Sequence, residues 1–213
     1  MMLRQYFRYV VYLLVAAGIS SAHAGAYEDF FQAVNRDDGD TVKTLVQRGF
    51  DPNSRDPQGQ TGMHLALRDE SPRVVQALWA SPALDVNAVN GSGETPLMMA
   101  ALRGDLDWSK RLIERGAATH KEGWSPLHYA ATGPEPKIVA LLLDRGAPID
   151  ARSPNRSTPL MMAARYGAEG NVDLLLARGA DKRLRNDLNQ DASDFAKMGE
   201  REFLLRRLNV PAR

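Results

Sequence analysis

The sequence contains no cysteine among its 213 residues. This absence excludes disulfide bonds and also the attachment of a lipid anchor to an N-terminal cysteine. The fold must therefore be stable without covalent cross-links, even if the protein is exported to an oxidising compartment.

The chain also has no strong net charge, because it contains 27 basic and 26 acidic side chains. Nothing in this balance indicates binding to nucleic acid or to an anionic membrane. The charges are uneven along the chain, since residues 25–70 hold nine acids and five bases whereas residues 151–213 hold eight acids and twelve bases. This distribution fits either a molecule with an acidic and a basic end or ordinary surface variation.

The motifs of common enzyme chemistry are absent as well. There is no glycine-rich phosphate loop and no Gly-x-Ser-x-Gly nucleophile elbow. No nucleophile stands at a recognisable spacing from a base. We therefore expect no catalytic residues and no enzymatic activity.

Residues 1–24 have the three parts of a secretory signal peptide. Two arginines give a basic start, residues 10–19 form an apolar run, and residues 22–24 read Ala-His-Ala. The run is short for a membrane span, although retention as an uncleaved anchor is an alternative. We expect cleavage before Gly25 and a periplasmic protein of a Gram-negative bacterium that does not contact the membrane.

One stretch of the chain recurs at a nearly fixed period. It reads GETPLMMAA at residues 93–101, GWSPLHYAA at 123–131 and RSTPLMMAA at 156–164, with weaker copies around Thr61 and Asp191. The threonine-like positions 61, 95, 125, 158 and 191 lie 34, 30, 33 and 33 residues apart. A period of this size indicates a stack of small repeated units.

Each unit carries signals for two helices. A threonine or serine followed by proline begins a helix, because the hydroxyl accepts a free N–H and proline loses no hydrogen bond there. A basic residue followed by glycine ends a helix, and this pair recurs at residues 48–49, 115–116, 145–146 and 178–179. The leucine triplets at 141–143 and 174–176 are too apolar for a surface helix, so we expect them to be packed between neighbours.

These units, closed by turns such as DVNA at 85–88 and PIDA at 148–151, resemble the ankyrin repeat. The resemblance implies an all-α solenoid of helix-turn-helix units joined by β-hairpin-like turns. The expected domain spans residues 25–213, with units at 26–56, 57–90, 91–122, 123–154 and 155–187 and a C-terminal cap at 188–210. Two departures stand out: Gly62 replaces the proline, and the unit at 91–122 has a turn about three residues short.

Histidine and methionine are the candidate metal ligands. His64 and His128 share one place in the motif, where each ring can bond a hydroxyl of its own unit and a carbonyl of the next. The pairs Met98–Met99 and Met161–Met162 also share repeat positions, and thioethers can hold Cu(I), but methionine is a frequent filler of apolar cores. No metal-ligand spacing accompanies them, so we expect no metal and no cofactor.

The resemblance implies that a partner lies along the concave side, which the turn tips and the ends of the first helices form. Those helix ends are residues 68–69, 102–103, 132–133 and 165–166. The predicted partner-binding residues are Gln60, Arg68, Glu94, Arg103, Trp124, Arg165 and Tyr166. Trp124 is the expected centre, because tryptophan, tyrosine and arginine dominate interface hot spots. Alternatively, Trp124 only covers the shortened turn.

The sequence therefore predicts a monomeric, non-catalytic periplasmic scaffold that binds another protein. Two versions of this role are an accessory of an envelope enzyme, for example in stress defence, and an immunity protein that neutralises a periplasm-acting toxin. A copper- or haem-handling protein is an alternative from another class.

Overall fold

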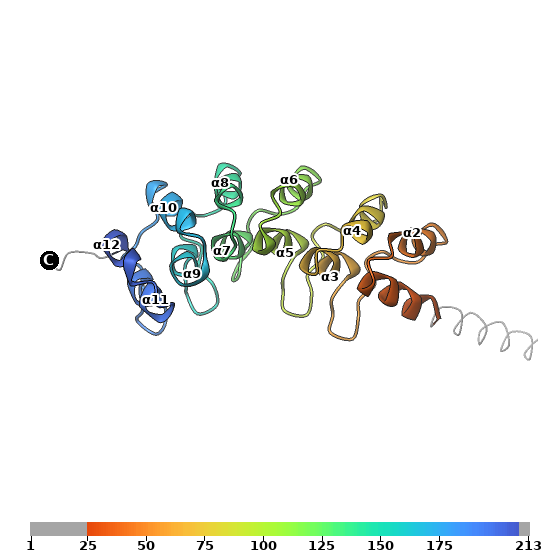
Figure 1. Cartoon of the computed structure of the whole chain (residues 1–213), viewed down its shortest axis with the longest axis horizontal. Coiled ribbons are helices and arrows are strands. Elements are labelled where there is room, and N and C mark those ends of the chain that lie inside the picture. Colours follow the sequence, from red (N-terminus) through yellow and green to blue (C-terminus); the bar gives the residue numbers. More distant parts are fainter. Residues whose placement is uncertain (1–24, 209–213) are drawn as a thin grey trace, which may run out of the picture. The chain divides into compact units, whose positions relative to one another are not determined.

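A computed structural model of the chain describes residues 25–208, so the expected signal peptide lies outside the described residues. Every regular element in the described part is a helix, apart from one isolated β-bridge between Arg55 and Thr61 (Figure 1). This confirms the all-α prediction. No helix within residues 25–208 has the length and apolar character needed to cross a membrane.

The chain divides into two compact units. Among the described residues, the first contains 25–56 together with Thr61–Leu84, and the second contains Pro57–Gln60 and 85–208. In the first unit, residues 25–35 are helical, and three further helices follow: α2 (Gly39–Gln47), α3 (Gly62–Arg68) and α4 (Pro72–Trp79).

Gly62, which departs from the Thr-Pro pattern, has a packing reason. A Cβ atom at this position would lie 3.0 Å from Cζ of Phe30 and 3.3 Å from Cδ1 of Leu78. Phe30 and Leu78 are both fully buried. Because their side chains fill the space over the start of α3, no room remains for a proline ring.

The second unit consists of helix pairs arranged in two rows. Its elements are α5 (Pro96–Arg103), α6 (Leu106–Glu114), α7 (Pro126–Thr132), α8 (Pro136–Asp144), α9 (Pro159–Tyr166), α10 (Glu169–Ala177), α11 (Ala192–Met198), η1 (Glu202–Leu204) and α12 (Leu205–Leu208). Helices α5, α7 and α9 form one row, here called the inner row, and α6, α8 and α10 form the outer row (Figure 1).

Alanine pairs pack the inner row together. The pairs Ala100–Ala101, Ala130–Ala131 and Ala163–Ala164 are each at most 1% exposed. Such small side chains let the helix backbones approach closely. In the outer row, Leu142 and Leu175 are fully buried, but the other leucines of both triplets are only partly buried. The expected packing between neighbours thus applies to the central leucine of each triplet.

Most helix ends follow the sequence signals. A proline occupies the first turn of α5, α7 and α9. Thr95 Oγ1 accepts a hydrogen bond from the N–H of Met98, and Thr158 Oγ1 accepts one from Met161. The four glycines that follow basic residues have φ between 83° and 97°, which is the left-handed conformation expected for a helix stop (Gly49, Gly116, Gly146 and Gly179).

Two side chains from the following units bind the C-terminal carbonyls of inner helices, which the sequence did not reveal. Asn171 Nδ2, fully buried in α10, donates to the carbonyl oxygens of Ala131 (3.0 Å) and Gly133 (2.8 Å) at the end of α7. Arg201 Nη1 donates to the carbonyl of Ala163 in α9 at 2.8 Å. At the ends of α7 and α9, the following unit thereby satisfies free carbonyl acceptors.

Hairpin-like turns precede the inner helices and α11. Three of them close with backbone hydrogen bonds from Asn90 to Glu94 (2.9 Å), from Ser153 to Ser157 (3.0 Å) and from Asn186 to Gln190 (3.0 Å). The side-chain oxygens of Asn90, Ser153 and Asn186 also accept N–H groups within their own turns. The turn before α7 is visibly shorter than those before α5 and α9 (Figure 1).

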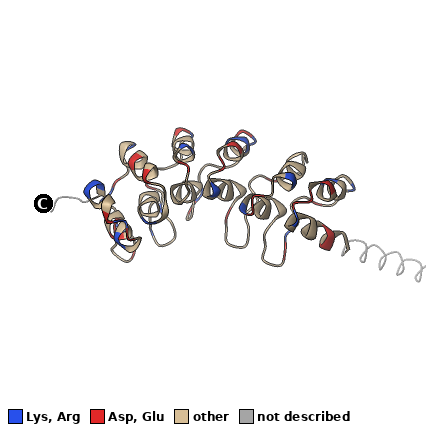
Figure 2. Cartoon of the chain, in the orientation of Figure 1, with Lys and Arg blue, Asp and Glu red and all other residues tan. Residues whose placement is uncertain are grey.

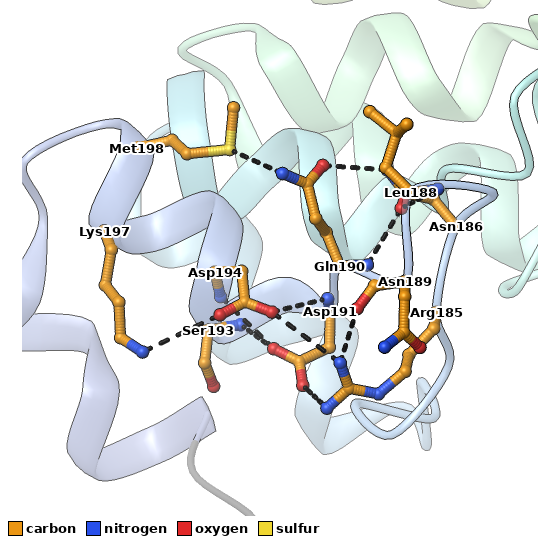
Figure 3. Close-up of polar contacts among 10 residues, drawn as sticks. All are labelled: Arg185, Asn186, Leu188, Asn189, Gln190, Asp191, Ser193, Asp194, Lys197 and Met198. Carbon is orange, nitrogen blue, oxygen red and sulfur yellow. Dashed lines mark hydrogen bonds and ion pairs between the residues drawn. The ribbon is translucent and has the colours of Figure 1, made fainter.

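Arg185 holds the last of these turns in place (Figure 3). Its Nη1 donates to the carbonyl of Asn189, and its Nη2 lies 2.8 Å from Oδ2 of Asp191. Asp191 Oδ1 in turn accepts from the N–H groups of Ser193 (2.9 Å) and Asp194 (3.2 Å) at the start of α11. The degenerate last copy therefore keeps its helix start, with a carboxylate in place of the threonine hydroxyl.

We predict that Leu142→Ala lowers the free energy of unfolding by roughly 2–5 kcal/mol, and that Leu175→Ala does the same, because both side chains are fully buried. The partly buried Leu141→Ala is the matched control and should cost less. Urea unfolding measures these differences. Native-state amide exchange should show the loss of protection first around the mutated unit, and a uniform loss would contradict the repeat-by-repeat picture.

Candidate functional site

A pocket of about 260 Å³ opens on the inner row of the second unit. Its lining is almost wholly apolar and comes from α5, α7, α9 and the short turn before α7. The lining residues are Leu102, Trp124, His128, Tyr129, Thr132 and Met162.

Trp124 stands at the end of the short turn, directly before α7. Its ring meets the ring of His128 edge to face, with centroids 5.3 Å apart and planes at 78°. The residue is only partly exposed. Trp124 therefore packs against α7 and lines the pocket at the same time.

His128 is held by hydrogen bonds on both ring nitrogens. Nδ1 lies 2.8 Å from Ser125 Oγ and accepts the backbone N–H of Ser125 at 3.3 Å, while Nε2 donates to the carbonyl of Ser157 at 3.1 Å. These partners fit the neutral ring with its proton on Nε2. Burial lowers the pKa of His128 from 6.5 to about 4. The structural role expected from the sequence is confirmed for this residue.

The same motif position is filled by methionine in α5 and α9. Sδ of Met98 accepts the backbone N–H of Thr95 at 3.4 Å, and Sδ of Met161 accepts that of Thr158 at 3.4 Å. Both methionines are at most 1% exposed. Their sulfurs thus pack in the core as the sequence favoured, at the position where His128 uses its ring nitrogen. Residues 25–208 contain no group of three or more His, Asp or Glu placed to hold a metal ion.

Glu94 accepts hydrogen bonds both from a residue of its own turn and from a residue that lines the pocket. Its Oε1 accepts the hydroxyl of Tyr129 at 2.6 Å, and its Oε2 accepts Nδ2 of Asn90 at 2.6 Å. Asn90 Nδ2 also donates to Oε1 of Gln60 at 3.0 Å. Burial and the nearby carboxylate raise the pKa of Tyr129, so its hydroxyl remains a donor. Two predicted site residues, Gln60 and Glu94, therefore belong to one network that fixes a pocket wall.

The predicted arginines lie apart from the pocket lining. Arg165 at the end of α9 places its guanidinium 4.9 Å from the ring centre of Tyr166, which is 53% exposed. Arg103 is exposed at the end of α5, next to Leu102. Arg68 belongs to the first unit and pairs with its neighbour Asp69 at 2.7 Å.

The sequence analysis missed Tyr129 and Met162 as pocket residues. Both stand four positions after the threonine-like residue, while Leu102 and Thr132 stand seven positions after it. Residues three apart share one face of a helix. Aligning the repeats by column would therefore have identified this face, although only the structure shows that its side chains leave a pocket.

We predict that the buried His128 makes stability depend on pH. Between a folded pKa of about 4 and the unfolded value of 6.5, the unfolded chain binds a proton that the folded chain does not. The free energy of unfolding is therefore not reduced by His128 above pH 6.5. It falls as the pH drops from 6.5 toward 4, by roughly 3 kcal/mol in total. Urea unfolding at several pH values measures it.

His128→Met is the matched control, because Met98 and Met161 occupy the same place in the other units. This variant should lose that component of the pH dependence, whatever its stability at neutral pH. An equal slope in both proteins would contradict the assignment.

A family model of ankyrin repeats (three copies) matches residues 30–122 and 100–186. The mouse (Mus musculus) B-cell lymphoma 3 protein homolog is 36% identical over 154 residues, which cover 69% of this chain and 34% of that protein. Human (Homo sapiens) neurogenic locus notch homolog protein 1 is 30% identical over 164 residues, covering 69% of this chain and 6% of that protein. Human SH3 and multiple ankyrin repeat domains protein 2 is 35% identical over 152 residues, covering 68% and 8%.

The chain spans about a third of the first relative and less than a tenth of the other two. The family match extends over most of residues 30–186 and includes the helices that form the pocket. Ankyrin repeats are scaffolds for protein–protein interaction. This chain belongs to the ankyrin repeat family.

Proposed function

We propose that this chain is a periplasmic scaffold that binds another protein through the inner row of its second unit and performs no catalysis. The observation that carries the proposal is the apolar pocket beside Trp124. Concave, mostly apolar sites with a few polar groups are the usual binding sites on proteins. The partner contact would be centred on Trp124 and Tyr129.

The pocket walls have the properties of an interface centre. Aromatic rings contribute a large contact area with few rotatable bonds, and here both rings are already positioned. Trp124 packs on His128, and Tyr129 bonds Glu94. A partner would therefore meet a preformed surface.

The periplasmic assignment rests on the basic start, the apolar run and the Ala-His-Ala ending of residues 1–24. We predict that the protein purified from fractionated cells is found in the periplasmic fraction and begins at Gly25. N-terminal sequencing measures this. An unprocessed chain in the inner membrane as the main species would refute the assignment.

The partner can be captured by a photoreactive phenylalanine introduced at Thr132, which lines the pocket. The control position is Lys137, which is exposed on α8 of the outer row. We expect a discrete cross-linked protein from position 132 and none from position 137. The same product from both positions, or from neither, would contradict the proposal.

We predict that Trp124→Ala weakens binding of that partner by about 2 kcal/mol or more, since the indole forms a wall of the pocket. Arg103→Ala and Tyr166→Ala should cost less, because neither residue lines the pocket. Lys137→Ala should leave the affinity unchanged. Calorimetry measures the affinities, and thermal unfolding shows whether each variant is folded. Normal binding by a folded Trp124→Ala variant would place the interface elsewhere.

A further inference from the structure

The pocket is too small for most free ligands. Its volume is about 260 Å³, below the roughly 300–1,000 Å³ of sites that bind drug-sized molecules. One bulky apolar side chain would fill much of this space. Met162 on the far wall has a flexible, polarizable side chain that adapts to differently shaped occupants.

Basic side chains stand next to pocket residues along the chain. Arg103 follows Leu102 at the end of α5, and Arg165 lies one helical turn after Met162 in α9. Arg156 precedes Ser157, whose carbonyl accepts Nε2 of His128. Both carboxylate oxygens of Glu94 already accept hydrogen bonds from Tyr129 and Asn90. Helix α7, which lies between these charges, has no charged residue and is drawn in tan (Figure 2).

Arg156 and Arg165 have no ion-pair partner within residues 25–208. Arg165 contacts the ring of Tyr166, and the carbonyl of Arg156 accepts a hydrogen bond from Arg152. Guanidinium groups are well suited to paired hydrogen bonds with carboxylates. Both arginines are therefore available to an acidic partner.

Arg156 also holds an unfavourable backbone conformation. Its φ is +60°, at a turn position where three other copies have glycine with φ between +75° and +77° (Gly59, Gly93 and Gly123). The left-handed region is costly for a residue with a Cβ, and such strain is often found at functional sites. The last copy has Asn189 at this position with φ +58°, and glycine at position 156 would relieve the strain at this exposed tip.

We infer that the pocket binds an acidic segment of the partner protein, with one bulky apolar side chain in the pocket and flanking carboxylates paired to Arg156 and Arg165. The inference rests on the proposed function and names the chemistry of the partner. The small apolar pocket selects the bulky apolar side chain of the segment, and the two arginines favour acidic residues on either side of that side chain.

A display library of random peptides, selected on the purified protein and depleted on Trp124→Ala, tests the inference. We expect enriched peptides in which phenylalanine, leucine, methionine or tryptophan is flanked by aspartate or glutamate. Fluorescence anisotropy with an enriched, labelled peptide should show binding that weakens as salt is added. Enrichment of basic or uncharged peptides would overturn the inference, as would the absence of any enrichment.

Arg156→Gly separates binding from folding. The variant should bind the peptide about tenfold more weakly and unfold at an equal or higher temperature, because the strain is gone. Arg165→Gln should weaken binding similarly, whereas Lys137→Gln, which removes one charge from the outer row, should not. Unchanged affinity in both arginine variants would overturn the inference.

Three further outcomes distinguish the alternatives. Self-association of the protein that Trp124→Ala abolishes, seen by sedimentation, would identify a second copy as the occupant and overturn the inference. A cross-linked partner from position 132 without acidic peptides would leave the proposed function standing and refute only the inference. Acidic peptides without a cross-linked partner would support the pocket chemistry and refute the proposed function.

Discussion

Close contact between neighbouring inner helices is the constraint on which the second unit depends. The alanine pairs of α5, α7 and α9 are buried, and glycines at the helix ends allow the same approach. A Cβ atom at Gly133 would lie 2.6 Å from the carbonyl oxygen of Ala101, and one at Gly167 would overlap that of Ala131. Two larger side chains of these helices, those of Tyr129 and Met162, are only partly buried. Both line the pocket.

The repeats solve the same local problems with different residues. The N–H of the residue that begins an inner helix is accepted by Sδ of Met98 in α5 and by Nδ1 of His128 in α7. The carbonyls that end α7 bind the amide of Asn171, and those of α9 bind the guanidinium of Arg201. What recurs is a hydrogen-bond acceptor at the start of an inner helix and a hydrogen-bond donor at its end. The identity of the residue is free to vary, which gives each unit its own surface.

Much of this fold could be predicted from the sequence, because the signals for it are local. The Thr-Pro helix starts and the basic-glycine helix stops depend on neighbouring residues, and they recur often enough to exclude chance. Contacts between units were harder to predict. Asn171 donates a hydrogen bond to a carbonyl of α7, and Gly62 packs against Phe30. Both contacts depend on how the helix backbones pack. Trp124 lines the pocket, but its contact with His128 and the pocket that the two residues share depend on three-dimensional positions.

Hydrogen bonds accepted by the side chains of Asn90, Ser153 and Asn186 hold together the turns that precede α5, α9 and α11. Each of these side chains is nearly buried, so water competes poorly for its hydrogen bonds. Loops that must become ordered on contact lose conformational entropy at that moment, and this loss weakens association. In this chain the turn tips become ordered when the protein folds, so this entropy is lost before any partner binds. The contact energy between the tips and any molecule that reaches them is therefore reduced little by the cost of arranging the loops, and recognition comes closer to a rigid fit than to an induced one.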